Sequence, residues 1–330
     1  MTNAPHDSDA FPQFLASELP ERPAGECRFQ VIPVPYEATV SYGGGTAKGP
    51  AAILEASSQL EVWTGRNIPS EQGIYTRRPV PCRGSAEDVL ERIERAVEEA
   101  LAEGPQGTLP YSAVAPMPTF SPPACRCAST VPVILGGEHT VTLGVLRALK
   151  KRYGTFGVVQ FDAHADLRDT YEGSPYSHAC VMRRAMDDLD LPLFQVGVRS
   201  LSPEEVAYRK EKHVIHLDAR KVRFPRHWSN GCAGRNGRPV PPLLPASFPD
   251  KVFLTFDVDA FDASLMPATG TPEPGGLFWW DALHLIERSL AGRVTLGFDV
   301  VELAPIPGMH APTYTATRLV HEIMGLFGEE

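Results

Sequence analysis

The chain has 330 residues, of which 43% are hydrophobic, and this is enough for one large α/β domain with a substantial core. Its formal net charge is −9, and no basic run is interleaved with aromatic residues, so we expect no nucleic-acid partner. No apolar stretch is long enough to cross a bilayer, and the amino terminus lacks the features of a secretory signal. We therefore expect a cytoplasmic protein without membrane contact.

The six cysteines are expected to be thiols. Disulfides chiefly stabilise short secreted chains that cannot build a core of this size. Cys125 and Cys127 form the only close pair in the sequence, and their spacing differs from the C-x-x-C of redox and zinc motifs.

The amino-terminal third begins with a segment that we expect to be loose. Residues 1–26 are rich in Pro, Ala, Asp and Glu, which predicts a flexible lead-in. Alternating apolar residues predict a strand over 27–35, and a helix is predicted over 49–60 with Pro50 in its first turn. Apolar residues recur with helical spacing over 85–103, which predicts an amphipathic helix with one solvated face.

Two proline-rich segments show neither a helical nor a strand period. They cover about 104–129 and 224–249, and each is longer than an ordinary connection within a compact domain. Strands and helices continue to alternate after each segment. We therefore predict two surface insertions in a single domain that spans 27–330.

From residue 131 onwards the pattern alternates between strands and helices. This alternation predicts an α/β fold, a mainly parallel sheet with helices on both faces. Strands are predicted at 131–135, 157–161, 193–198, 214–217, 252–256 and 294–298, and helices at 140–152, 178–188, 203–212, 282–290 and 314–327. Sites in such sheets form beyond the carboxyl ends of the strands.

Acidic residues or histidines follow four of these predicted strands. The clearest case is Asp162, His164 and Asp166, because side chains two apart on an extended backbone point the same way. Taken alone, these three could belong to a solvated loop that is charged by chance. The other three strand ends contribute His139, Asp257, Asp259, Asp299 and Glu302. Four such strand ends at one edge of a sheet predict a functional site.

The combined inventory predicts a pair of metal ions. Two imidazoles and several carboxylates exceed what one ion can use, whereas two ions about 3.5–4 Å apart can share bridging carboxylates. Mn²⁺ fits a ligand set dominated by carboxylates best, although Ni, Co, Fe and Zn ions are also compatible. Such a pair activates water for hydrolysis.

Two further residues are candidates for binding and proton transfer. His178 lies near a predicted helix start and could be a general acid or proton shuttle, or simply a capping or surface histidine. Glu302 could bind a planar guanidinium through paired hydrogen bonds, or serve as a salt-bridge partner.

Five motifs resemble those of the ureohydrolase family, which includes arginase and agmatinase. They are GGEHT at 136–140, DAHAD at 162–166, SHAC at 177–180, DVDAFDASLMPATGTPEPGG at 257–276 and DVVE at 299–302. The resemblance covers about 31–327 except for the two predicted insertions. It implies an arginase-like, three-layer α/β/α fold with a binuclear manganese site.

The resemblance also implies roles for individual residues. One metal ion would be held by His139, Asp162, Asp166 and Asp257, and the other by His164, Asp162, Asp257 and Asp259, with Asp162 and Asp257 bridging. His178 matches the proton-shuttling histidine of the family, Glu302 matches its guanidinium-binding glutamate, and Thr271 lies in the loop that lines the guanidinium pocket. Activated water would attack the guanidinium carbon, and a proton would reach the leaving amine through Asp166 and His178.

Within the family, the chain resembles agmatinases more closely than arginases. The segment LRDTYEGSPYS, which precedes His178, lacks the asparagine by which arginases recognise the α-amino-acid end of their substrate. Asp169 and Glu172 favour a cationic tail such as that of agmatine, whereas Arg168 favours a carboxylate, as in 4-guanidinobutanoate. We expect agmatine to be hydrolysed to putrescine and urea, with 4-guanidinobutanoate, arginine or guanidine as alternatives.

Other classes of protein are less compatible with the motifs. A deacetylase of the same fold lineage would need a single-zinc pattern, and a two-metal phosphoesterase would need basic anchors of which only Arg168 is visible. A non-catalytic metal-binding protein that serves interactions is a further alternative. Because family members are commonly trimers or hexamers, we expect a homo-oligomer.

Overall fold

The computed structural model describes residues 12–20, 22–106, 125–222 and 242–327. The strands are β1 (Phe29–Val34), β2 (Ile74–Thr76), β3 (Arg126–Cys127), β4 (Val131–Gly136), β5 (Gly157–Phe161), β6 (Leu193–Val196), β7 (Ile215–Leu217), β8 (Lys251–Asp257) and β9 (Val294–Val301). The α-helices are α1 (Gly49–Ser57), α2 (Ala86–Glu103), α3 (Val141–Tyr153), α4 (Val181–Asp187), α5 (Pro203–Glu211), α6 (Trp279–Leu290) and α7 (His310–Gly325).

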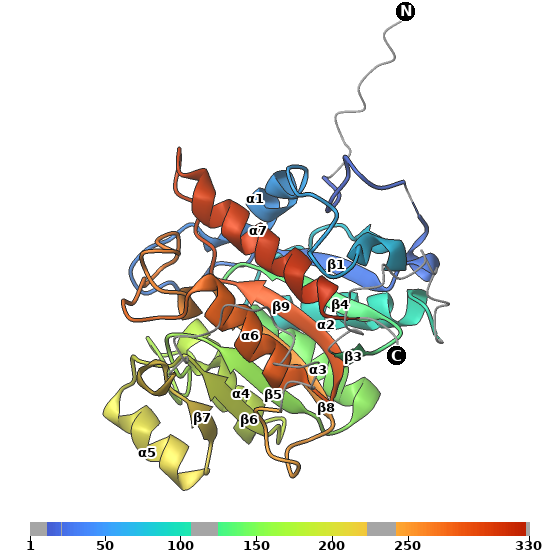
Figure 1. Cartoon of the computed structure of the whole chain (residues 1–330). Helices are drawn as coiled ribbons and strands as arrows, with labels where there is room; N and C mark the ends of the chain where they lie inside the picture. Colours follow the sequence, from blue (N-terminus) through green and yellow to red (C-terminus); the bar gives the residue numbers. More distant parts are fainter. Residues whose placement is uncertain (1–11, 21, 107–124, 223–241, 328–330) are drawn as a thin grey trace, which may run out of the picture.

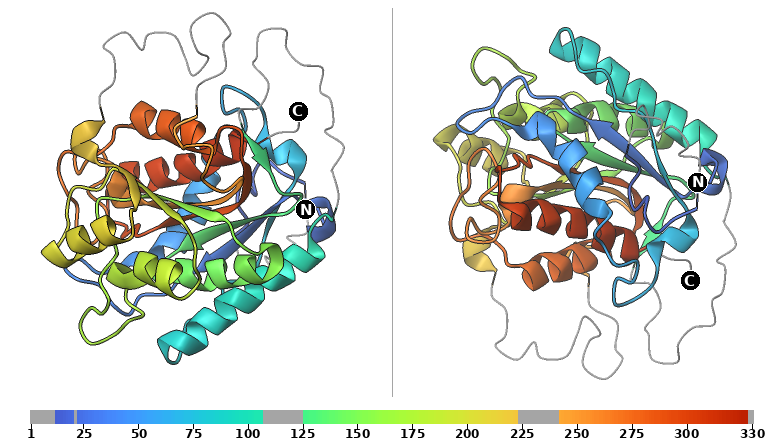
Figure 2. Two further views of the ribbon diagram at one scale, coloured as in Figure 1. Left: turned by 90° about the horizontal axis from the view of Figure 1, so that it is seen from below. Right: turned by 90° about the horizontal axis from the view of Figure 1, so that it is seen from above.

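In that part of the chain the strands form one parallel sheet in the order β2-β1-β4-β9-β8-β5-β6-β7, with β3 also paired to β9 (Figure 1). Helices α6 and α7 cover one face of this sheet, and α2, α3 and α4 cover the other (Figure 2). The predicted α/β/α fold with a parallel sheet is therefore confirmed.

Strand alternation divides the core between the two faces. In β4, Val133 and Leu135 join the apolar cluster that contains residues of α6 and α7, whereas Ile134 joins the cluster that contains residues of α2 and α3. Successive side chains of a strand point to opposite faces, so a strand covered on both sides needs an unbroken apolar run. The first residues of β4 and of β5 form such apolar runs. Both strands can therefore be predicted from the sequence.

Local signals also fix the helix starts. The Ser85 hydroxyl accepts a hydrogen bond from the Asp88 N–H, while the Asp88 carboxylate accepts one from the Ser85 N–H, which forms a capping box at the start of α2. The helix predicted over 178–188 begins as a 3₁₀ turn, His178–Cys180, and becomes α-helical only at Val181.

The described part of the amino-terminal lead-in packs against the domain. Phe14 and Leu15 are buried, and their backbone N–H groups donate to Thr76 Oγ1 and Ser57 Oγ, each at 2.9 Å. The prediction of a flexible segment is therefore wrong for these residues, because burial of two apolar side chains outweighs the polar composition around them.

Much of the two predicted insertions lies outside the described residues, at 107–124 and 223–241. Their described ends belong to the fold. Arg126 and Cys127 form β3, and Leu244 and Phe248 are buried in the core. The Phe248 ring lies directly on the backbone of Gly157, where an added Cβ would be 2.2 Å from a ring carbon. The predicted boundaries of both insertions are thus too wide.

The cysteines at positions 27, 82, 125 and 180 are free thiols as predicted, and the Cys127 sulfur accepts a hydrogen bond from Arg28. Cys232 lies outside the described residues. Within the described ranges, no helix is both long and apolar enough to span a membrane.

Candidate metal centre and active site

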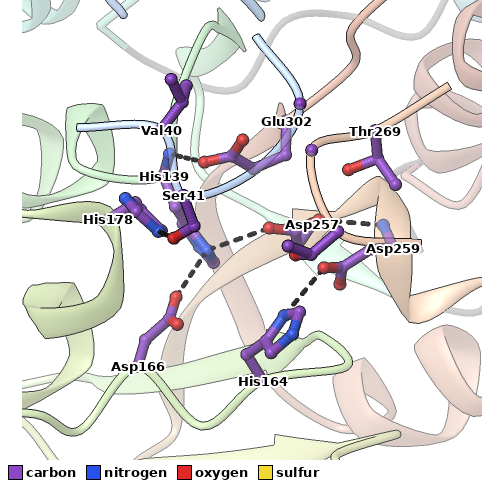
Figure 3. A pocket seen from close by; sticks show the side chains of 13 residues that line it. Val40, Ser41, His139, His164, Asp166, His178, Asp257, Asp259, Thr269 and Glu302 are labelled. Atoms are coloured by element: carbon purple, nitrogen blue, oxygen red, sulfur yellow. Dashed lines mark hydrogen bonds and ion pairs between the residues drawn. The ribbon is translucent and has the colours of Figure 1, made fainter. Parts of the chain in front are cut away.

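A cavity opens at the carboxyl edge of the sheet, beyond β4, β5, β8 and β9 (Figure 3). Eight of the residues predicted for the site line it, namely His139, His164, Asp166, His178, Asp257, Asp259, Thr271 and Glu302. Residues that follow four different strands thus lie around one cavity. The cavity is also lined by Val40, Ser41, Gly43, Thr269 and Gly270, which the sequence did not single out.

One half of the candidate metal centre is built around His139. Its Nδ1 lies 3.2 Å from an oxygen of Asp162, 3.0 Å from one of Asp166 and 3.5 Å from one of Asp257. Among the described residues this buried nitrogen makes no hydrogen bond of acceptable geometry. An imidazole nitrogen that faces three carboxylates in this way is suited to a cation between them.

The other half is built around His164. Its Nδ1 lies 2.9 Å from an oxygen of Asp259 and 3.7 Å from one of Asp162. Asp162 therefore belongs to both groups of metal-capable side chains, as a bridging ligand must. Asp257 Oδ1 accepts a hydrogen bond from the Asp259 N–H, which places these two carboxylates next to each other.

The electrostatics of the cluster also fit bound cations. Burial and the charge of Asp162 raise the pKa of Asp166 to about 7. Burial together with the charges of Asp259 and Asp162 raises the pKa of Asp257 well above its ordinary value. Buried carboxylates that repel one another are stabilised by a metal ion, so the residues present fit the dinuclear group that the family resemblance implies.

Asp299 was predicted to lie just beyond the end of a strand, and the structure differs. The sequence predicts that this strand ends at 298, but β9 continues to Val301, so Asp299 is a buried residue within the strand. Its carboxylate accepts hydrogen bonds from Thr142 Oγ1 at 2.7 Å and from the hydroxyl of Thr255. Thr255 Oγ1 in turn lies 2.7 Å from His139 Nε2. The chain from Asp299 through Thr255 orients His139 and leaves Nδ1 for a metal, an outer-shell arrangement common around metal-binding histidines.

Two site residues have a left-handed backbone. Asp166 has φ of 54° and Glu302 has φ of 65°, a region that residues other than glycine rarely adopt. Long-range hydrogen bonds hold both, since the Asp166 carbonyl accepts from the N–H groups of Met182 and Arg183, and the Glu302 N–H donates to the Gly137 carbonyl. Such conformations cluster at functional sites, where the surrounding fold supports them.

His178 is held by a loop that the sequence did not connect with it. Its Nδ1 lies 3.1 Å from Thr39 Oγ1, and its Nε2 lies 2.9 Å from Ser41 Oγ. The buried carboxylate of Glu138 accepts from the Thr39 hydroxyl at 2.8 Å and from the N–H groups of Ala38 and Thr39. Burial lowers the pKa of His178. Nothing in the sequence spacing of Thr39, Ser41 and His178 indicates this contact.

The two acids predicted to bind the substrate tail are not among the described residues that line the cavity. Asp169 is exposed and pairs with Arg184 at 2.5 Å, so its carboxylate already has a cationic partner. Glu172 is exposed, with φ of 51°. Glu273, which the sequence analysis did not single out, has an oxygen 4.0 Å from Nε2 of His164. Because His164 lines the cavity, the negative charge of Glu273 lies near it.

A parallel α/β sheet with histidines and buried carboxylates gathered at its carboxyl edge is the arrangement expected of a metal-dependent hydrolase. The model of the arginase family matches residues 27–325. This chain belongs to the arginase family, whose enzymes hydrolyse amidino bonds. Membership of an enzyme family argues against the non-catalytic alternative.

Individual relatives agree with this assignment. An N(1)-aminopropylagmatine ureohydrolase from Synechocystis sp. is 36% identical over 96% of this chain and 94% of its own length. An agmatinase from Pyrococcus horikoshii is 29% identical over 94% of this chain and 95% of its own length. The crystal structure of an agmatine ureohydrolase from Thermoplasma volcanium matches 97% of this chain and 95% of its own, with a TM-score of 0.71 and 26% identity.

Proposed function

We propose that this protein hydrolyses the guanidino group of a linear guanidino-amine, agmatine or N(1)-aminopropylagmatine, to urea and the corresponding amine. The observation that carries the proposal is the arrangement of the cavity. Two His–Asp groups that share Asp162 lie beside it, and Glu302 and His178 line the same space.

The proposed metal ligands are those that the family resemblance implies, and both metal-capable groups in the structure are compatible with them. His139, Asp162, Asp166 and Asp257 would hold one ion, and His164, Asp162, Asp257 and Asp259 the other, and we propose Mn²⁺ for both. When bound, the ions would lower the pKa of a water molecule and offset the negative charge that develops in the transition state.

Glu302 is the proposed anchor of the guanidinium. It is buried, and one of its oxygens accepts a hydrogen bond from the His139 N–H at 2.7 Å, which fixes the orientation of the carboxylate. Burial raises the pKa of Glu302 well above its ordinary value. A cationic guanidinium, which can donate two parallel hydrogen bonds to a carboxylate, would restore the charged form.

Asp166 and His178 are the proposed path for the proton. A carboxylate oxygen of Asp166 would take the proton from the attacking water, and His178 Nε2 would deliver it to the leaving amine. Ser41 holds this Nε2 at the wall of the cavity. A histidine whose pKa is lowered by burial is neutral at physiological pH and can accept and return a proton.

The tail of the substrate is proposed to be cationic. Glu273 supplies negative charge near His164, whereas Asp169 is already paired with Arg184, and Glu172 stays a proposed second acid. Arg168 lies with its guanidinium 5.5 Å from the centre of the Tyr171 ring. The curated relative with 36% identity acts, by its name, on the longer N(1)-aminopropylagmatine, so this compound is a candidate equal to agmatine.

Urea release by the Mn²⁺-loaded protein tests the proposal. Agmatine, N(1)-aminopropylagmatine, 4-guanidinobutanoate, arginine and guanidine should be compared at equal concentration, and we expect turnover of one of the first two. Glu302→Gln should lower kcat/KM by about 100-fold or more through loss of the guanidinium pair. Glu287→Gln is a matched control, because Glu287, which lies on α6, is also buried but pairs with Arg66. Absence of urea from every compound, with two ions bound, would refute the proposal.

A trimeric or hexameric assembly is also proposed from the family resemblance, and a cytoplasmic location is proposed from the sequence features described above. Light scattering of the purified protein tests the assembly directly.

A further inference from the structure

Arg199, which follows β6, connects three segments of the site through backbone carbonyl groups. Its side chain is half-buried, and its three nitrogens all donate. The acceptors are the carbonyl oxygens of Gly197 at 3.1 Å, Asp259 at 2.7 Å, Phe261 at 3.1 Å, Glu273 at 2.8 Å and Pro274 at 3.1 Å.

The backbone of the same residue reaches the other metal-binding segment. The N–H groups of Arg199 and Ser200 donate to the Ala163 carbonyl, at 2.8 and 3.0 Å, and Ser200 forms an isolated bridge with His164. Ala163 stands between Asp162 and His164, and its own N–H donates to a carboxylate oxygen of Asp259 at 2.9 Å.

These contacts begin where the sheet stops. The ladder between β5 and β8 ends at the pair Phe161 and Phe256, so it does not fix the residues beyond it. Asp259 lies three residues past the end of this ladder on β8, and His164 lies three residues past it on β5. The positions of these two side chains therefore depend on contacts between loops, and Arg199 supplies contacts to both loops and to the loop that lines the cavity.

We propose that Arg199 is a positioning residue for the metal site formed by His164 and Asp259, and for the loop 269–276 along the substrate cavity. Arginine suits this task because its rigid, planar guanidinium presents five donors in fixed directions, whereas a lysine ammonium is a single point. The inference rests on the proposed two-metal function of the cavity, but it concerns metal affinity, which is measured without turnover.

A role in stability alone would have a different signature. Arg293 offers a matched control, because it is a buried arginine that likewise donates to backbone carbonyls, those of Pro245 at 2.8 Å and Ala291 at 3.4 Å. It precedes β9 at the opposite edge of the sheet from the cavity. Replacing either arginine should lower stability, but only the replacement of Arg199 should change the metal site.

The experiment is a calorimetric titration of the full chain, freed of metal, with Mn²⁺ alone. Arg199→Met should retain one ion with near-normal affinity and bind the second about 10- to 100-fold more weakly, the usual effect of losing an outer-shell partner. Arg199→Lys should show a smaller loss of affinity for the second ion. This variant decides the question if Arg199→Met does not fold. Arg293→Met should lower Tm and leave both binding steps unchanged.

The inference would be overturned if folded Arg199→Met or Arg199→Lys bound two ions with wild-type affinity. It would also be overturned if Arg293→Met lost as much affinity for the second ion as Arg199→Met. Urea assays on the same proteins should show a raised KM in the Arg199 variants, because the loop that carries Glu273 is no longer held. If the wild-type protein binds two ions but releases no urea, the proposed function fails while the titration still decides the role of Arg199.

Discussion

His321 makes the stability of this protein depend on pH in a way that can be calculated. It lies on α7 with a fully buried side chain, and among the described residues neither of its ring nitrogens has a hydrogen-bond partner. Burial, with the nearby positive charge of Arg318, lowers the pKa of His321 to about 4. In the unfolded chain the imidazole titrates at its ordinary pKa of about 6.5.

The sign of the effect follows from these two values. A group whose pKa is lowered by folding contributes stability that is fully present above pH 6.5 and is lost as the pH falls towards 4, because the unfolded chain binds the proton first. The two pKa values predict a loss of about 2 kcal/mol at pH 5 and about 3 kcal/mol at pH 4 from this one residue.

Chemical denaturation at pH 7.5 and pH 5.0, followed by circular dichroism, measures this loss. Because carboxylates also titrate in this range, the useful quantity is the difference between the wild type and His321→Leu. The variant should lose about 2 kcal/mol less than the wild type between the two pH values. His310→Leu, exposed on the first turn of the same helix, is the control and should behave as the wild type. Equal losses in the wild type and His321→Leu would show that His321 does not titrate as its burial implies.

Two further predictions concern the site. Thr39→Val removes the hydroxyl that joins Glu138 to His178, so kcat for urea release should fall about 10- to 100-fold with little change in KM. Thr39→Ser keeps a hydroxyl and should retain activity. An unchanged kcat in Thr39→Val would contradict the proposed orientation of His178. Asp162→Asn should lose both Mn²⁺ ions, since Asp162 belongs to both ligand groups, while Asp187→Asn on the surface of α4 should keep them. Metal analysis after gel filtration checks this, and two ions retained by Asp162→Asn would contradict a bridging role.

Local patterns in the sequence determined most of the regular structure. The apolar runs of β4, β5 and β8 and the capping box at Ser85 are short-range features, because neighbours in the chain suffice to favour them. The same is true of Asp162, His164 and Asp166, whose spacing of two at a strand end already requires that they project together. Sites in parallel sheets form beyond the carboxyl ends of the strands, and this tendency predicted that four strand ends would meet at one site without any knowledge of contacts.

Only the tertiary structure decided which residues support that site. Thr39 and His178 are 139 residues apart and Arg199 and Glu273 are 74 residues apart, and neither pair has a sequence spacing that reflects contact. Asp299 follows an apolar run in the sequence but lies within β9, because Val300 and Val301 continue its pairing with β8. The pairing of Asp169 with Arg184 could not be read from the sequence either, because the two residues lie in different elements. Periodicity records whether a side chain faces the core, whereas hydrogen bonds between loops depend on where the folded sheet brings distant segments together.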